Sequence, residues 1–192
     1  MSYDISLVER ISGKTIELPN GHVMTGGTYQ AEYDAETNTF YPAATKEAWL
    51  NITYNYGRYY YEAAEGDERF YGGDGEQTFT NLGIRGIYGK SGAESIPMLQ
   101  DLAARIEAKY NKNGKWIKVR RIRKVYRDKN GEEIAPIDVF TRKIEGTEEI
   151  EYEANEGPND DYWTATAANA IRPLYQLLAF AQLRPDGVWD GD

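Results

Sequence analysis

The chain of 192 residues contains no cysteine and a single histidine, His22. Without cysteine there is no disulfide, no thiolate nucleophile and no zinc site with cysteine ligands. His22 lies in the turn-like sequence Asn20-Gly21-His22, and nothing marks a serine or threonine nucleophile that it would activate. We therefore interpret His22 as a structural histidine, and we expect no metal ion and no cofactor.

The chain also lacks a long hydrophobic run. No stretch approaches the ~20 apolar residues of a membrane span, and the N-terminal sequence MSYDISLVER lacks the basic and apolar regions of a signal peptide. With 41% hydrophobic and 28% charged residues, the composition is that of a soluble globular protein. We expect a cytoplasmic protein without membrane contact, folded as a single domain over residues 1–192.

Hydrophobic periodicity predicts an α+β fold, in which an antiparallel sheet packs with two main helices. We expect short strands within 2–18, a strand at 28–33 and a central strand at 48–53, with polar loops at 34–46 and 65–80. A short helix is predicted at 59–64. A longer helix at 96–110 and a third at 162–182 carry apolar stripes, and Pro173 predicts a kink or a late start in the latter.

A basic segment interrupts this acidic chain, whose net charge is −9. Residues 112–129 contain nine basic residues and one acidic residue. We predict a β-hairpin insertion at 112–155, with strands at 116–127 and 133–144 joined through Asn130-Gly131 and a further strand at 148–153. The candidate binding residues of this basic hairpin are Lys118, Arg120, Arg121, Arg123 and Lys124.

Two interpretations of the basic hairpin stay open. Basic residues interleaved with aromatic ones suit single-stranded nucleic acid or an acidic protein. Alternatively, the hairpin is a solvated edge, whose charges the neighbouring glutamates neutralise across the strands. The acidic remainder of the chain repels nucleic acid, so nucleic acid would bind only through this hairpin.

Tyrosine is abundant, with 16 residues, and it is densest in the segment 48–63, AWLNITYNYGRYYYEA. A tyrosine offers a stiff apolar face and a hydroxyl that both donates and accepts, which suits recognition better than bond breaking. Asn51 and Asn55 disfavour a strand that the surrounding residues favour, and such local conflict is expected at functional sites. The alternative is that these aromatic residues line the core.

A glycine-rich turn precedes the helix at 96–110. Gly89-Lys90-Ser91 is similar to the end of a phosphate-binding Walker A loop, but five residues separate Gly83 from Gly89, where that loop has four. We expect no such loop. Arg85 and Lys90 nevertheless flank a helix N-terminus, which favours an anion such as phosphate. The alternative is a capped turn with solvated bases.

Several segments together resemble a family of uncharacterised proteins from phage, prophage and bacterial genomes. They are YDI at 3–5, GGTY at 26–29, LNITYNY at 50–56, IRGIYGKSG at 84–92, DYWTATAANA at 161–170 and the sequence PDGVWDGD at 185–192. The segment 112–155 and parts of 34–46 and 65–77 look like insertions. The resemblance implies a small accessory cytosolic protein and assigns no catalytic residue.

We predict a non-enzymatic binding protein of phage or prophage origin. An inhibitor of host defence and a ligand-sequestering protein would both fit this prediction. Its partner would be a protein or a small phosphorylated ligand. The alternatives are an enzyme that acts on a nucleotide or sugar-phosphate and, third, a virion or structural protein. The predicted binding site combines Asn51, Tyr54, Asn55, Tyr56, Arg58, Arg85, Lys90 and Trp163.

Overall fold

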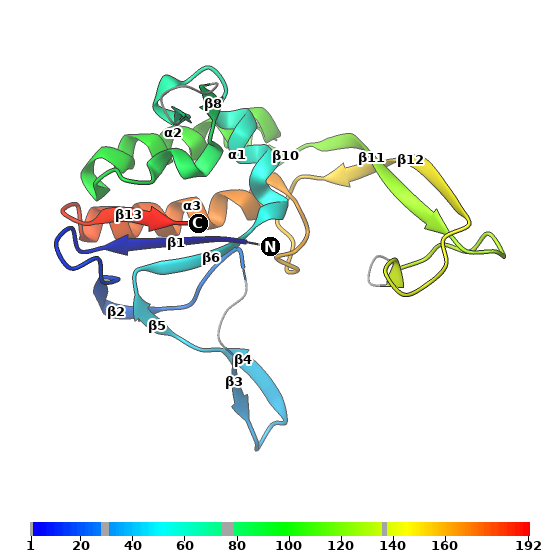
Figure 1. The fold of residues 1–192 in the computed structure, drawn as a ribbon, viewed down its shortest axis with the longest axis horizontal. Helices are drawn as coiled ribbons and strands as arrows, with labels where there is room; N and C mark the ends of the chain where they lie inside the picture. The colour runs from blue at the N-terminus through cyan, green and yellow to red at the C-terminus, as the bar shows by residue number, and fades with distance from the viewer. Residues whose placement is uncertain (1, 28–30, 74–78, 136–137) are drawn as a thin grey trace. The chain divides into compact units, whose positions relative to one another are not determined.

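A computed structural model describes residues 2–27, 31–73, 79–135 and 138–192 and confirms the α+β class (Figure 1). The chain divides into two compact units. We call Met1–Trp116 together with Gly157–Asp192 the body, and Ile117–Glu156 the arm. The arm covers nearly the same residues as the insertion predicted from the sequence.

A three-stranded antiparallel sheet forms one side of the body. Its central strand is β1 (Ser2–Val8), flanked by β13 (Val188–Gly191) and β6 (Trp49–Thr53). The predicted central strand at 48–53 is therefore wrong in its position, because β6 lies at the edge. Beside β6, the bare backbone of Gly27 packs so closely that an added Cβ would lie 1.5 Å from the Asn51 carbonyl oxygen. The Gly26 carbonyl accepts from the Thr53 N–H at 2.9 Å, so this glycine turn lies directly against the edge of β6.

Smaller two-stranded sheets surround this one. The polar loop predicted at 34–46 is wrong, because these residues contain part of one β-hairpin and the start of a further strand. Residues 28–30 of the strand predicted at 28–33 lie outside the described residues. Short strands also occur within 65–80, of which 74–78 are likewise outside. The pairs are β2 (Glu17–His22) with β5 (Thr45–Glu47), β3 (Ala31–Asp34) with β4 (Thr39–Pro42), β7 (Tyr71–Gly72) with β8 (Thr80–Asn81), and β9 (Asn111–Lys112) with β10 (Lys115–Trp116).

The described ranges contain three α-helices, α1 (Gly57–Ala64), α2 (Gly92–Tyr110) and α3 (Ala167–Leu183), and short 3₁₀ helices at η1 (Tyr54–Tyr56), η2 (Glu68–Phe70) and η3 (Gly83–Ile87). Ser91 starts α2 with a capping box, in which its hydroxyl accepts from the Glu94 N–H while the Glu94 carboxylate accepts from the Ser91 N–H. Thr166 caps α3, so this helix starts at Ala167, and Pro173 lies inside it rather than at its start.

The hydrophobic core lies largely between α2 and α3, which run alongside each other (Figure 1). The two helices are antiparallel, because Gly92 at the start of α2 packs against the backbone of Arg184 just after α3. The predicted stripe of α2 is buried at Leu99, Ala103 and Ile106, but it packs mainly on α3 rather than on the sheet. No helix in the described ranges is long and apolar enough to span a membrane.

The arm is built on a hairpin of β11 (Lys118–Arg127) and β12 (Gly146–Asn155). The predicted partner strand at 133–144 is therefore wrong. Ile134 does donate its N–H to the Tyr126 carbonyl, but this contact stays an isolated bridge, and the polypeptide returns to pair with β11 only at Gly146.

Replacing Leu99 with alanine tests the helical core. Leu99 is fully buried, so Leu99→Ala should lower the free energy of unfolding by about 2–5 kcal/mol. Leu183→Ala is the matched control, because Leu183 is 54% exposed and should change it by less than about 0.5 kcal/mol. Urea denaturation measures both, and equal midpoints for the two variants would contradict this core.

Candidate functional site

The eight residues predicted to form one binding site all lie in the body, but they do not converge on one pocket of the described residues. Tyr56 lines a cavity of about 190 Å³ beside Gly26, Gly27 and Tyr162. The other seven separate into side chains that cross-link elements of the body and side chains that lie around Trp163.

Arg85 belongs to the cross-linking group. It donates from Nη2 to the Tyr54 hydroxyl at 2.8 Å and from Nε to the Asp192 carbonyl at 2.9 Å. Its guanidinium also stacks on the ring of Tyr3, 4.8 Å from the centroid. Arg85 therefore ties η3 to η1, to β1 and to the residue after β13, and a phosphate would have to compete with these contacts.

Asn51 and Lys90 also make contacts within the body. The Asn51 amide donates to the Ser2 hydroxyl and to the Asp4 carboxylate, both at 2.7 Å, which links β6 to β1. The main chain of Lys90 joins the η3 turn to β13, because its carbonyl accepts from the Trp189 N–H at 2.9 Å. Neither contact forms an anion site with Arg85.

The tyrosine cluster is mainly core. Tyr56, Tyr59 and Tyr60 are fully buried. Their hydroxyls donate to carbonyls of a segment more than a hundred residues away: Tyr56 to Tyr162 at 2.5 Å, Tyr59 to Ala165 at 2.8 Å and Tyr60 to Ala170 at 2.9 Å. Burial raises the pKa of Tyr56 to about 12, so its hydroxyl remains a donor at neutral pH.

These bonds hold residues 159–165, which we call the Trp163 loop. The Asn55 amide donates to the Trp163 carbonyl at 2.8 Å. Within the loop, the Asp161 carboxylate accepts from the Trp163 N–H at 3.0 Å and from the Thr164 hydroxyl at 3.0 Å. The main chain is thus fixed on both sides, whereas the Trp163 side chain stays 47% exposed.

Aromatic and polar side chains surround Trp163. Its ring lies 4.9 Å from that of Tyr162, centroid to centroid. Asn55 and Arg58 are exposed, and Arg58 stacks on the ring of Tyr59, whose hydroxyl reaches the loop at Ala165. Of the eight predicted residues, the structure thus places Asn55, Tyr56 and Trp163 at the same loop, and Arg58 is joined to it through Tyr59.

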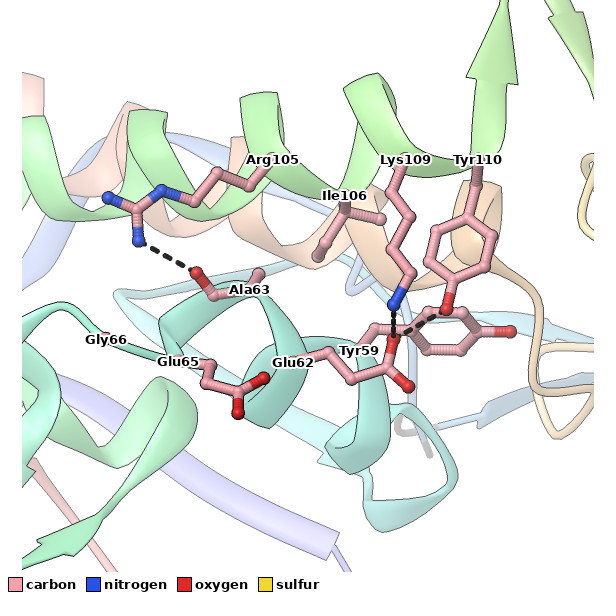
Figure 2. Close-up of a pocket in the computed structure, with 9 residues that line it drawn as sticks. All are labelled: Tyr59, Glu62, Ala63, Glu65, Gly66, Arg105, Ile106, Lys109 and Tyr110. Carbon is pink, nitrogen blue, oxygen red and sulfur yellow. Dashed lines mark hydrogen bonds and ion pairs between the residues drawn. The ribbon is translucent and has the colours of Figure 1, made fainter.

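A second site, which sequence reasoning missed, is a pocket of about 320 Å³ between α1 and α2 (Figure 2). At its centre the Glu62 carboxylate accepts from Lys109 Nζ at 2.9 Å and from the Tyr110 hydroxyl at 2.6 Å. Arg105 donates to the Ala63 carbonyl at 2.9 Å. In the sequence, the one sign of this site is the spacing of Arg105 and Lys109, which places two basic side chains one turn apart on the same face of α2.

The charges of this pocket compensate one another. Although burial acts to raise the pKa of Glu62, the hydrogen bonds from Tyr110 and Lys109 lower it. Hydrogen bonds from Arg69 and then from Arg105 hold the pKa of the neighbouring Asp67 well below its usual range. These two carboxylates are therefore ionised members of ion pairs, of which Glu62 ties α1 to α2 and Asp67 ties the start of η2 to α2. Neither is poised to donate a proton near neutral pH.

His22 is fully engaged in structural contacts, as predicted. Its Nε2 donates to the Glu47 carbonyl at 2.8 Å, and its Nδ1 accepts from the Gln176 amide at 2.9 Å. In the part of the chain that the structure describes, no three or more side chains of histidine, aspartate or glutamate come together as metal ligands would.

The predicted basic residues of the arm divide into paired and unpaired ones. Arg121 forms an ion pair with Glu156, Arg123 with Glu133 at 2.6 Å and Lys118 with Glu153 at 3.7 Å. Among residues 117–135 and 138–156, Arg120 and Lys124 have no ion pair. The arm thus neutralises much of its own charge.

Comparison with protein-family models, with curated proteins and with solved structures found no match to this chain.

The ion pairs of Asp67 predict a pH dependence. Because the pKa of Asp67 is lower in the folded than in the unfolded protein, its stabilising effect is present above the unfolded pKa of about 3.9 and is lost as the pH falls below it. The free energy of unfolding of Asp67→Asn should therefore be lower than that of the wild type at pH 6, and the two should converge towards pH 2. Urea denaturation across this range measures both, with Glu65→Gln, in the same pocket, as the control. A difference that is independent of pH would contradict the assignment.

Self-neutralisation of the arm predicts negligible binding to polyanions. Wild type and Arg120→Glu/Arg123→Glu should both bind single-stranded DNA or RNA negligibly at low and at moderate salt, because paired bases release few counterions. Fluorescence anisotropy at two ionic strengths measures this. Wild-type binding that falls steeply with salt and disappears in the variant would establish a nucleic-acid interface instead.

Proposed function

We propose that this is a non-enzymatic binding protein, and that the Trp163 loop is its docking site for a protein partner. The observation that carries the proposal is the combination of a half-exposed tryptophan with a main chain that hydrogen bonds hold on every side. A large aromatic side chain on a rigid support loses little conformational entropy when a partner covers it. Tryptophan, tyrosine and arginine are also the residues that dominate protein interfaces energetically.

The buried tyrosines support this proposal indirectly. Tyr56 and Tyr59 donate to carbonyls on either side of Trp163, and Asn55 donates to the carbonyl of Trp163 itself. The unusual segment 48–63 therefore serves as the support of the site, while Asn55 and Arg58 extend the surface that a partner would contact. The resemblance to phage and prophage proteins leads us to expect a protein of the bacterial host as the partner, as an inhibitor of host defence would bind.

An enzyme acting on a nucleotide or sugar-phosphate has less support. That alternative depended on Arg85 and Lys90 gripping a phosphate together. Arg85 instead binds Tyr54 and Asp192, and Lys90 contributes its main chain to the contact with β13.

The test compares three forms of the full chain. Immobilised wild type, Trp163→Ala and Tyr175→Ala are each exposed to a bacterial lysate, and proteins retained by wild type are purified for affinity measurements. We expect Trp163→Ala to weaken binding by about 30-fold or more, as truncation of a hot-spot residue does. Tyr175 is 51% exposed on α3 and serves as the matched control, with unchanged affinity expected.

Two further measurements make the result interpretable. Thermal unfolding should show that Trp163→Ala is folded, because the main chain of Trp163, which alanine retains, makes the hydrogen bonds. A partner bound equally by all three forms would refute the Trp163 loop as the docking site. Thermal-shift screening of nucleotides and sugar-phosphates tests the enzyme alternative, since stabilisation at millimolar ligand that is lost in Arg85→Ala would favour it.

A further inference from the structure

The outer edge of β11, which faces away from β12, presents backbone groups without backbone partners. The Ile117 carbonyl accepts from the Glu156 N–H, and the register is continuous from Lys118 to Arg127. Since backbone direction alternates along a strand, the odd-numbered residues of β11 bond to β12 and the even-numbered ones face outward. Within 117–135 and 138–156, the N–H groups of Arg120, Ile122 and Lys124 accordingly have no backbone partner.

The chain itself already adds a short acidic segment to the far end of this edge. Ile134 donates its N–H to the outward carbonyl of Tyr126 at 2.7 Å and is almost completely buried. Glu133, next to it, forms a bridge with Arg127, and its carboxylate accepts two hydrogen bonds from Arg123, at 2.6 and 3.2 Å. An acidic residue followed by an apolar one therefore fits this edge.

The open part of the edge also carries basic side chains, on the opposite face of β11 from Arg123. Lys118, Arg120, Ile122 and Lys124 share one face of β11, because they alternate with the residues that face the other side. Ile122 is 64% exposed. In the described part of the arm, Arg120 and Lys124 have no ion pair. An added strand would be matched by acidic side chains beside Arg120 and Lys124.

We infer that the edge Lys118–Lys124 of β11 is a docking edge for an acidic, extended segment of a partner protein, which adds to the arm as a third strand. Main-chain hydrogen bonds provide the attachment, and the side chains select the occupant. The basic residues exclude a second β11 and any other basic strand by like-charge repulsion.

A second copy of this chain fits the edge less well. The acidic β12, GTEEIEYEAN, would match the charge, but in every copy it is already paired along its whole length with its own β11. A strand from a different protein avoids this obstacle.

Amide hydrogen exchange on the full-length protein, followed by NMR, tests the inference. The probe is the synthetic peptide GTEEIEYEAN, because it is acidic and β12 shows that this sequence forms a strand against the other edge of β11. At millimolar peptide, the amides of Arg120, Ile122 and Lys124 should exchange at least about tenfold more slowly, while those of Val119 and Arg121, which bond to β12, should be unchanged. The control is the same peptide with lysine in place of all four glutamates, which should protect none of them.

A pair of charge-reversal variants separates the edge from overall charge. Arg120→Glu/Lys124→Glu should weaken peptide binding at least about tenfold, whereas Lys115→Glu/Lys129→Glu, with the same change in charge, should leave it unchanged. Retained protection of Val119 and Arg121 shows that the hairpin is intact. Trp163→Ala should bind the peptide as the wild type does. A failure of the Trp163 loop as a docking site would therefore be distinguishable from a failure of the β11 edge.

Three results would overturn the inference. They are an absence of protection at millimolar peptide, equal protection by the lysine peptide, and protection that increases with protein concentration when no peptide is present. The last result would identify a second copy as the occupant.

Discussion

The body depends on hydroxyl-to-carbonyl hydrogen bonds that reach across most of the sequence. Tyr56, Tyr59 and Tyr60 lie within five consecutive residues, and each donates to a different carbonyl between Tyr162 and Ala170. Each hydroxyl replaces a water molecule that the buried carbonyl would otherwise need. The rings fill the core while their tips orient the segment that leads into α3, so packing and positioning come from the same side chains. Both the Trp163 loop and the start of α3 rest on this arrangement.

The body and the arm use their charges differently. In the body, ion pairs clamp elements together, as where Lys109 and Tyr110 meet Glu62 between α1 and α2. In the arm, the basic residues of β11 lie beside the acidic residues of β12, so their charges compensate one another between the two strands. The outer edge of β11 is nevertheless basic and that of β12 acidic. An asymmetric edge can still accept a strand of the opposite charge while it rejects its own kind. The two units therefore suit two separate contacts.

Some elements could be predicted because their signals are local. Ser91 and Glu94 mark the start of α2, and Leu99, Ala103 and Ile106 mark its buried face, so one window of sequence contains the whole helix. The partner of β11 could not be predicted in this way. Both 133–144 and 148–153 have strand-like composition, and the Asn130-Gly131 turn favours the nearer one. The choice depends on where the polypeptide can return after Ile134, which is a tertiary property.

The candidate site was predictable only in part for a similar reason. The composition of 48–63 drew attention to a segment that supports the Trp163 loop, and Asn55 does contact Trp163. Sequence alone, however, does not separate a tyrosine that faces a ligand from one that donates to a distant carbonyl, as Tyr56 does. The Glu62–Lys109 contact joins residues 47 positions apart, so neither helix reveals it by itself.

Because β1 pairs with β13, the central sheet of the body joins residues from opposite ends of the sequence. The Asp4 N–H donates to the Asp192 carboxylate across 188 positions, and Leu7 lies opposite Trp189. During synthesis, β1 emerges from the ribosome first and waits for β13, whereas the arm contains both of its own strands and closes earlier. Contacts of such long range slow folding, because the loop-closure entropy is lost before the contact forms. Until then the edge of β1 that pairs with β13 has no strand partner, and an unpaired edge favours aggregation of a partly folded chain.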